Sequence, residues 1–179
     1  MIKPAVASDS QLKAHMQQEL SQGAHGFSLP AITGVFKNYR ARAYRATSNQ
    51  TAIPDSTYTK IQFNGESFDP NANFDSTTAY GYTAPKAGYY RISAQAELSP
   101  VAADKVVLLR IFVNSSFKAY AEKYQAVNTS WIQLQVSDEI YLAAGDVVYA
   151  YVWHNAGSAT PAVTYGEWAT FMVVSFVSE

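Results

Sequence analysis

Three histidines are the side chains best suited to proton transfer or metal binding near neutral pH. His15 has no second histidine four residues away, so the spacing of a zinc-binding pair is missing. His25 lies beside glycine in a segment that also contains proline. His154 would need a serine and an aspartate beside it to act in a catalytic triad, and the sequence contains no Gly-x-Ser-x-Gly motif. We therefore expect His154 to be a structural histidine, hydrogen-bonded in a loop.

Paired carboxylates could support glycosidic chemistry if two of them faced the same bond. The pairs close in sequence are Asp138 with Glu139 and Glu66 with Asp69. Adjacent acids are usually solvated, and Asp69 before Pro70 fits an Asx turn. No run of acids has the spacing of an EF-hand loop. We therefore predict a protein that is not an enzyme, with no catalytic residue, no metal and no cofactor.

Basic residues form one cluster, Arg40, Arg42 and Arg45, with Lys37 nearby. The cluster could contact an acidic glycan or another anionic partner. The interpretation we favour is an edge strand whose charges prevent aggregation. Arg110 lies inside an apolar run, a position that would suit an ion pair with an acid at a subunit contact.

The composition narrows the class of protein. Of 179 residues, 48% are hydrophobic, which excludes a generally disordered chain. A formal net charge of −1 leaves no basic excess for phosphates, so nucleic-acid binding is not expected. Cysteine is absent, which excludes disulfides and thiolate ligands. Charged residues make up 15% and aromatic residues 14%, which suits a β-rich protein that buries further surface in an oligomer or on a ligand.

The first nine residues contain no long apolar run, and nowhere do about eighteen apolar residues follow one another. We therefore expect no secretory signal and no membrane insertion. The expected location is a virion or the extracellular space, reached by a route such as cell lysis.

Residues 8–23 carry a helix signal. Leu12, Met16 and Leu20 repeat every four residues and form a narrow apolar stripe, and Gly23 can end the helix. Such a stripe must pack on the head of its own chain, on its copies in an oligomer, or on a separate partner. We predict that it anchors the chain to a larger particle or helps it to trimerise.

The chain divides into residues 1–36, a helix and a linker arm, and residues 37–179, an all-β head. Short strand-like segments with turn signals between them and no helix predict an antiparallel sandwich. The expected strands are 40–46, 58–63, 78–83, 89–98, 106–113, 116–124, 130–141, 147–154 and 170–177.

The segment 147–154 has two contrasting faces. Alternate positions from Val148 to Val152 are small and aliphatic, as expected for a core. A soluble monomer rarely exposes a stripe like the one opposite. Either the strand is buried on both faces within one subunit, or this stripe lies in a subunit interface, which we favour. The predicted trimer interface consists of Val147, Tyr149, Tyr151 and Trp153.

Several segments, in this order, resemble the C1q/TNF-like jelly-roll family. The most recognisable is TAPKAGYYRI (83–92), similar to the family's Pro-x-x-Gly-x-Tyr pattern, and LAAGDVVY (142–149) is similar to Leu-x-x-Gly-Asp-x-Val. The others are SNQTAIP (48–54), TKIQF (59–63), SFDP (67–70) followed by Asn73-Phe74, and TFMVV (170–174). The resemblance covers roughly residues 38–177. The sequence departs from the family in lacking a collagen-like stalk and cysteine, and in having Val173 and Val174 where glycine is usual.

The resemblance implies a jelly roll of about eight to ten strands. It also implies a tight homotrimer that binds partners on its outer surface, and enzymatic activity is not typical. On this analogy the segment 147–153 faces the threefold axis, with Tyr149 and Tyr151 as the central aromatics.

Aromatic residues flanked by amide and hydroxyl groups could stack on sugars, although ordinary packing is the alternative. The candidate ligand-binding loops carry Phe117, Tyr120, Tyr165 and Trp168. We expect a homotrimeric attachment protein, a spike, head-fibre or tail-fibre component of a bacteriophage virion, that binds a host glycan or surface protein. The alternatives are a stand-alone bacterial carbohydrate-binding or adhesion module and, from a third class, a glycan hydrolase.

Overall fold

The computed structural model describes residues 38–127, 131–157 and 161–179, and these residues form strands connected by turns and loops. The predicted helix with Leu12, Met16 and Leu20, the linker arm and Lys37 lie outside the described residues, and the division at residue 36 stays a prediction. In the described part of the chain, no helix is long and apolar enough to span a membrane. The strands are β1 (Arg40–Tyr44), β2 (Thr59–Lys60), β3 (Gly65–Phe68), β4 (Phe74–Asp75), β5 (Gly81–Thr83), β6 (Gly88–Ser99), β7 (Lys105–Val113), β8 (Ser116–Gln125), β9 (Ile132–Leu142), β10 (Val147–His154), β11 (Ala162–Val163) and β12 (Phe171–Ser178).

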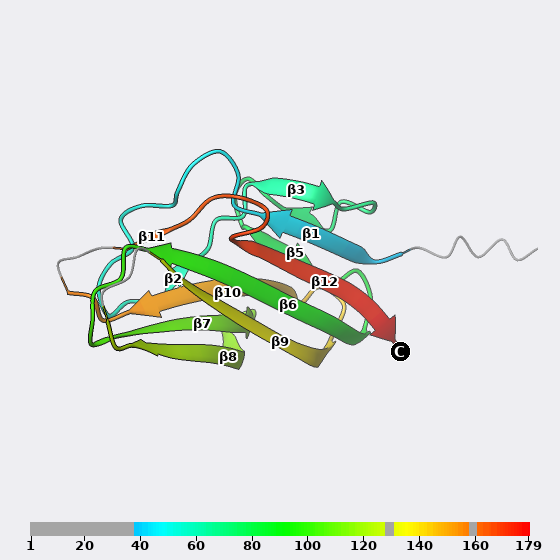
Figure 1. Cartoon of the computed structure of the whole chain (residues 1–179). Helices are drawn as coiled ribbons and strands as arrows, with labels where there is room; N and C mark the ends of the chain where they lie inside the picture. The colour runs from blue at the N-terminus through cyan, green and yellow to red at the C-terminus, as the bar shows by residue number, and fades with distance from the viewer. Residues whose placement is uncertain (1–37, 128–130, 158–160) are drawn as a thin grey trace, which may run out of the picture. The chain divides into compact units, whose positions relative to one another are not determined.

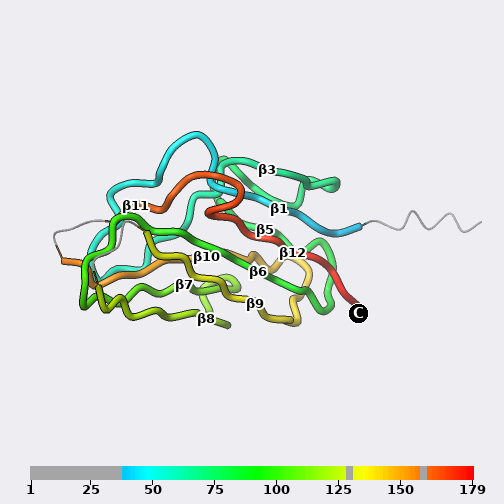
Figure 2. Tube along the Cα trace, viewed as in Figure 1, coloured from blue at the N-terminus to red at the C-terminus, as the bar shows by residue number. Residues whose placement is uncertain are grey.

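Two antiparallel sheets make up the head (Figure 1). The first has the order β11-β6-β12-β1-β3, and β9 also pairs with β6. The second has the order β4-β5-β10-β7-β8, and β2 also pairs with β10. The chain passes from the first sheet to the second after β6, returns after β8, and crosses again on either side of β10 (Figure 2). Consecutive long strands therefore often lie in different sheets, as in a jelly roll.

The core lies between the inner faces of the two sheets. In β6, Tyr90, Ile92 and Ala94 are fully buried, and in β10 the alternate positions from Val148 to Val152 are fully buried too. A strand places successive side chains on opposite faces, so this alternation gives each sheet one inner and one outer face. The predicted antiparallel sandwich with a small aliphatic face on β10 is therefore confirmed.

The arginine-bearing strand β1 is not an edge strand, so that expectation is wrong. β1 pairs with β12 on one side and with the short strand β3 on the other. β3 carries no strand signal in the sequence, because its Asn64-Gly65 start resembles a turn. The charges of Arg40 and Arg42 therefore do not protect an exposed edge.

The predicted strand 58–63 is shorter than expected, and a side chain takes the place of a neighbouring strand on the edge that faces away from β10. Regular pairing with β10 is confined to Thr59 and Lys60. Beyond them, the Gln62 N–H donates to Gln50 Oε1 at 2.8 Å, and the Gln50 amide nitrogen donates to the Lys60 carbonyl, also at 2.8 Å. An amide side chain thus satisfies backbone groups that a neighbouring strand would otherwise pair.

Because of Asp75, we expect the stability of the head to depend on pH in the acidic range. Its carboxylate accepts backbone N–H groups from Thr77 (2.9 Å), Thr78 (2.8 Å) and Ala79 (3.1 Å) in the turn after β4. Hydrogen bonds from the Thr78 hydroxyl and from these amides hold the pKa of Asp75 well below its usual range. A lowered pKa stabilises the fold above the unfolded value of about 3.9 and loses that effect as the pH falls below it.

Replacing Asp75 with asparagine should lower Tm at pH 7, because one acceptor oxygen becomes an NH₂ group facing other donors. Thermal unfolding followed by circular dichroism between pH 7 and pH 3 would measure the difference from the unchanged protein. The difference in Tm between the two proteins should become smaller below about pH 4. A difference that stays constant across this range would contradict the assignment.

Candidate functional site

His154, the last residue of β10, is completely buried and has a partner at each ring nitrogen. The Ala156 N–H donates to Nδ1 at 3.1 Å, so Nε2 carries the hydrogen and donates to the Ile53 carbonyl at 3.0 Å. Asp55 Oδ1 is 3.7 Å from Nδ1 but accepts the Gly157 N–H at 2.6 Å. Within the described residues, no hydroxyl contacts either nitrogen. His154 therefore ties two loops to the end of β10, as the hydrogen-bonded histidine that we expected.

The acidic pairs form turns and surface ion pairs rather than a facing pair. Asp69 begins a turn in which the Ala72 N–H donates to its carbonyl at 3.3 Å, but its Oδ2 accepts the Phe74 N–H at 2.7 Å and not the N–H two residues on, as an Asx turn would. Glu66 lies exposed on β3. Asp138 and Glu139 are neighbours on β9, and Glu139 is paired with Arg91. Among the described residues, no group of three or more possible metal ligands is assembled.

The predicted interface stripe of β10 lies on the outer face of the second sheet, where its own subunit covers part of it. All four side chains, from Val147 to Trp153, are half-buried. Lys60 Nζ lies 4.1 Å from the centre of the Tyr149 ring, and that ring also rests on Gly81, where an added Cβ would be 2.6 Å from Cε1. Burial raises the pKa of the Tyr151 hydroxyl, with Tyr149 adding to the effect. The stripe is neither sealed in the core nor fully open.

The stripe continues into a larger surface that we call the aromatic face. The Tyr151 and Phe112 rings are 4.8 Å apart, and Phe112 lies 6.2 Å from Phe117. Phe117 and Tyr120 are on strand β8, so the expectation that they lie in a loop is corrected. The sequence patterns missed Tyr58 and Phe112, because these positions join the face through pairing between distant strands. The aromatic face consists of Tyr58, Arg110, Phe112, Phe117, Tyr120, Tyr149, Tyr151 and Trp153.

Arg110 is the cation at the centre of the aromatic face. In the register of the sheet it stands between Tyr151 of β10 and Tyr120 of β8. Its guanidinium carbon lies 4.4 Å from the centre of the Tyr58 ring and 4.5 Å from that of Phe117. Its Nε is buried without a hydrogen-bond partner. Within the described part of the subunit Arg110 has no acidic partner, and its pairing with an acid across a subunit contact stays a prediction.

The outer face of the first sheet carries a second aromatic group, which we call the tyrosine face. Tyr89 of β6 and Tyr141 of β9 stand opposite each other, with ring centres 5.4 Å apart, and are 45% and 57% exposed. The neighbouring Arg91 and Glu139 pair with each other at 3.2 Å. The tyrosine face consists of Tyr89, Arg91, Ser93, Ser137, Glu139, Tyr141 and Val173.

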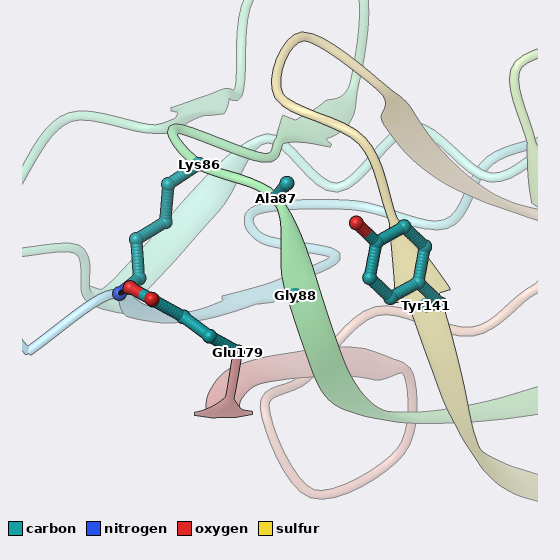
Figure 3. Close-up of a pocket in the computed structure, with 5 residues that line it drawn as sticks. All are labelled: Lys86, Ala87, Gly88, Tyr141 and Glu179. Carbon is teal, nitrogen blue, oxygen red and sulfur yellow. Dashed lines mark hydrogen bonds and ion pairs between the residues drawn. The ribbon is translucent and has the colours of Figure 1, made fainter.

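An open hollow of about 390 Å³ lies at one end of the tyrosine face (Figure 3). It is lined by Lys86, Ala87, Gly88, Tyr141 and Glu179. Lys86 Nζ donates to Glu179 Oε1 at 2.6 Å and lies 4.0 Å from the centre of the Phe176 ring. The charges at this hollow are therefore already paired.

The other two candidate ligand-binding residues are exposed and lie between β11 and β12. Tyr165 and Trp168 are 51% and 68% exposed. Their backbone is fixed, because the Tyr165 N–H donates to Asn49 Oδ1 and Gln95 donates to the Trp168 carbonyl. They are not among the residues of the aromatic face, so the four predicted ligand residues do not form one site. Ligand binding at each of them stays a prediction.

The arginine cluster makes mostly intramolecular contacts. Arg42 stacks on Phe171 at 4.7 Å, donates to Ser67 Oγ at 2.6 Å and pairs with Glu167 at 3.4 Å. Arg45 donates to the Ser48 and Gln62 carbonyls, and burial lowers its pKa. These contacts tie surface loops to β1 and leave little of the cluster for an anionic partner.

Comparison with known proteins identifies the fold. No protein-family model and no curated protein matches the sequence. Among solved structures, the chain is similar to the TNF protein Eiger from S. frugiperda, with 13% identity over 79% of this chain and 94% of that one and a TM-score of 0.56. It is similar to the globular domain of the zebrafish complement 1qA protein, with 15% identity over 78% of this chain and 95% of that one and a TM-score of 0.55.

The chain is also similar to murine APRIL, with 9% identity over 79% of this chain and 100% of that one and a TM-score of 0.57. The order of the strands and these structural likenesses together show that the head has the jelly-roll fold of TNF and C1q globular domains, which confirms the predicted fold class.

Proposed function

We propose that the chain is a non-enzymatic homotrimeric attachment protein, a spike, head-fibre or tail-fibre component of a virion whose head binds a ligand on the host surface. The observation that carries this proposal is the contrast between the two outer faces of the sandwich. Both expose aromatic rings, but the charges on one are paired within the subunit and the central cation on the other is not. One face is suited to contact with copies of the chain and the other to a ligand.

The tyrosine face is the better candidate for the contact between subunits. Burying a charge costs free energy unless it is paired, and Arg91 already has Glu139 as its partner. Tyr89 and Tyr141 are more exposed than any residue of the β10 stripe, so they have more surface left to bury. Tyrosine is favoured where a ring is covered and its hydroxyl finds a polar partner. The β10 stripe stays the competing prediction for this contact.

The N-terminal stripe of Leu12, Met16 and Leu20 supports anchoring to a larger particle, because a narrow apolar stripe needs a surface to cover it. The absence of cysteine is in keeping with a bacteriophage or prophage origin, which is part of this proposal. The second candidate is a stand-alone bacterial carbohydrate-binding or adhesion module, which the solvent-exposed Tyr165 and Trp168 would suit.

Particle association separates the two candidates. The full chain and a triple variant, Leu12→Asp, Met16→Asp and Leu20→Asp, would be produced in the source cells and lysates sedimented through a density gradient. We expect the unchanged chain to co-sediment with a high-mass particle and the triple variant to stay at the top as a trimer. An unchanged chain that never enters a particle but binds glycans would favour the stand-alone module.

A further inference from the structure

Arg110 is held as a rigid, unpaired cation in the aromatic face. Two rings flank its guanidinium, Tyr58 at 4.4 Å and Phe117 at 4.5 Å, and Tyr120 lies 5.9 Å away. Aromatic contacts of this kind fix the plane of a guanidinium without using its N–H donors. The group is therefore oriented in advance of any partner.

No acceptor for this guanidinium is found in the part of the chain that the structure describes. Nε is buried without a hydrogen bond, and within the described residues Arg110 makes no hydrogen bond or ion pair. Arg110 as a whole is half-buried on the outer face of the sheet, so part of its side chain is open to solvent. A planar pair of N–H donors matches the two oxygens of a carboxylate, and this pairing is among the strongest neutralising contacts in proteins.

The surroundings of Arg110 favour a sugar as the carrier of that carboxylate. Lys60, which lies over Tyr149 of the same face, already donates to the Ala79 carbonyl at 3.1 Å, so Arg110 is the cation of this face that is left for an acid group. Around it the face offers partly exposed rings, including Tyr58, Phe117 and Tyr120 at 38%, 43% and 55% exposure. Such rings stack on the C–H faces of sugars, and tyrosine hydroxyls bond to sugar hydroxyls. An acidic peptide would present several charges, whereas Arg110 is the one cation among the residues that define the aromatic face.

We propose that the aromatic face binds a carboxylated glycan, with the acid group on Arg110 and neighbouring sugar rings on Phe117 and Tyr120. This assignment names the ligand class of the attachment function proposed above and rests on it. It also explains why a cation lies unpaired among aromatic rings.

A glycan array tests the assignment with the full chain. Each sialylated or uronate-containing glycan would be printed beside its parent, desialylated or carboxyl-reduced, which differs in the acid group. We expect the acidic member to bind at least about tenfold more tightly than its parent, and Arg110→Gln to remove this difference. Arg110→Lys should restore part of it, since lysine keeps the charge but not the planar pair of donors.

Two further variants separate recognition from folding. Tyr120→Ala removes a largely exposed ring and should weaken binding several-fold while Tm stays unchanged. Arg40→Gln removes an exposed arginine on the other sheet and should leave the preference for acid intact. Equal binding to acidic and parent glycans, or a preference that survives Arg110→Gln, would overturn the proposal, as would binding of polyglutamate in place of glycans. Particle association and native mass are measured separately, so they would stand even if the glycan assignment failed.

Discussion

Replacing Tyr141 with lysine is expected to leave the head folded and to convert the proposed trimer into monomers. Tyr141 is 57% exposed in the single subunit, so the substitution removes few contacts within it. In the trimer, Tyr141 and its partner Tyr89 would lie against a neighbouring copy, and three lysines would be buried without acids to pair with them. Sedimentation equilibrium should show association weakened by about a hundredfold or more, which corresponds to about 2.7 kcal/mol.

Tyr120→Lys is the matched control for this experiment, because Tyr120 is 55% exposed and lies on the opposite sheet. It should leave the mass of the trimer unchanged. If Tyr120→Lys dissociated the trimer and Tyr141→Lys did not, the subunit contact would lie on the aromatic face. The β10 stripe of Tyr149 and Tyr151 would then be the interface, as the sequence first suggested.

Replacing His154 with alanine is expected to lower the free energy of unfolding by about 3 kcal/mol. The substitution leaves a cavity in a fully buried position and removes the partner of both the Ile53 carbonyl and the Ala156 N–H. Urea denaturation at neutral pH would measure the loss. A change below about 1 kcal/mol would mean that the buried ring is not the connection between the two loops.

Two amide variants separate the contributions of the two His154 hydrogen bonds to this loss of stability. His154→Asn can keep an acceptor near the position of Nδ1, and His154→Gln can place a donor near that of Nε2. Each should cost less than alanine, because each leaves one buried backbone group unsatisfied rather than two. Equal losses for all three variants would show that the shape of the ring, and not its hydrogen bonds, determines the stability.

The long strands could be predicted from the sequence because their side chains alternate. The bounds of β10 agree with the prediction, and those of β6, β7 and β8 agree to within one residue at each end. The short strands β3, β4 and β11 could not be predicted, since two to four residues carry no period and pair only where the rest of the fold places them. The central position of β1 depends on β3 and was missed for the same reason.

The candidate surfaces could be predicted in part. The stripe from Val147 to Trp153 was found from its alternation, but its half-burial depends on Lys60 and Gly81, which lie far away in sequence. Arg110 was recognised as unusual in an apolar run. Its position between Tyr58 and Phe117 depends on the tertiary structure that brings β7, β8 and the residue before β2 together. Periodicity within one segment predicts which residues lie on the outer face of a strand. It does not predict which residues from distant segments cover that face.

The central claim is that the head is complete only when three copies bury their tyrosine faces. The native mass of the purified full chain, measured by light scattering at several protein concentrations, tests it most directly. The account predicts a mass near three times the 19.6 kDa of one chain, with no decline on dilution through the micromolar range. A single species of 19.6 kDa at every concentration would contradict it.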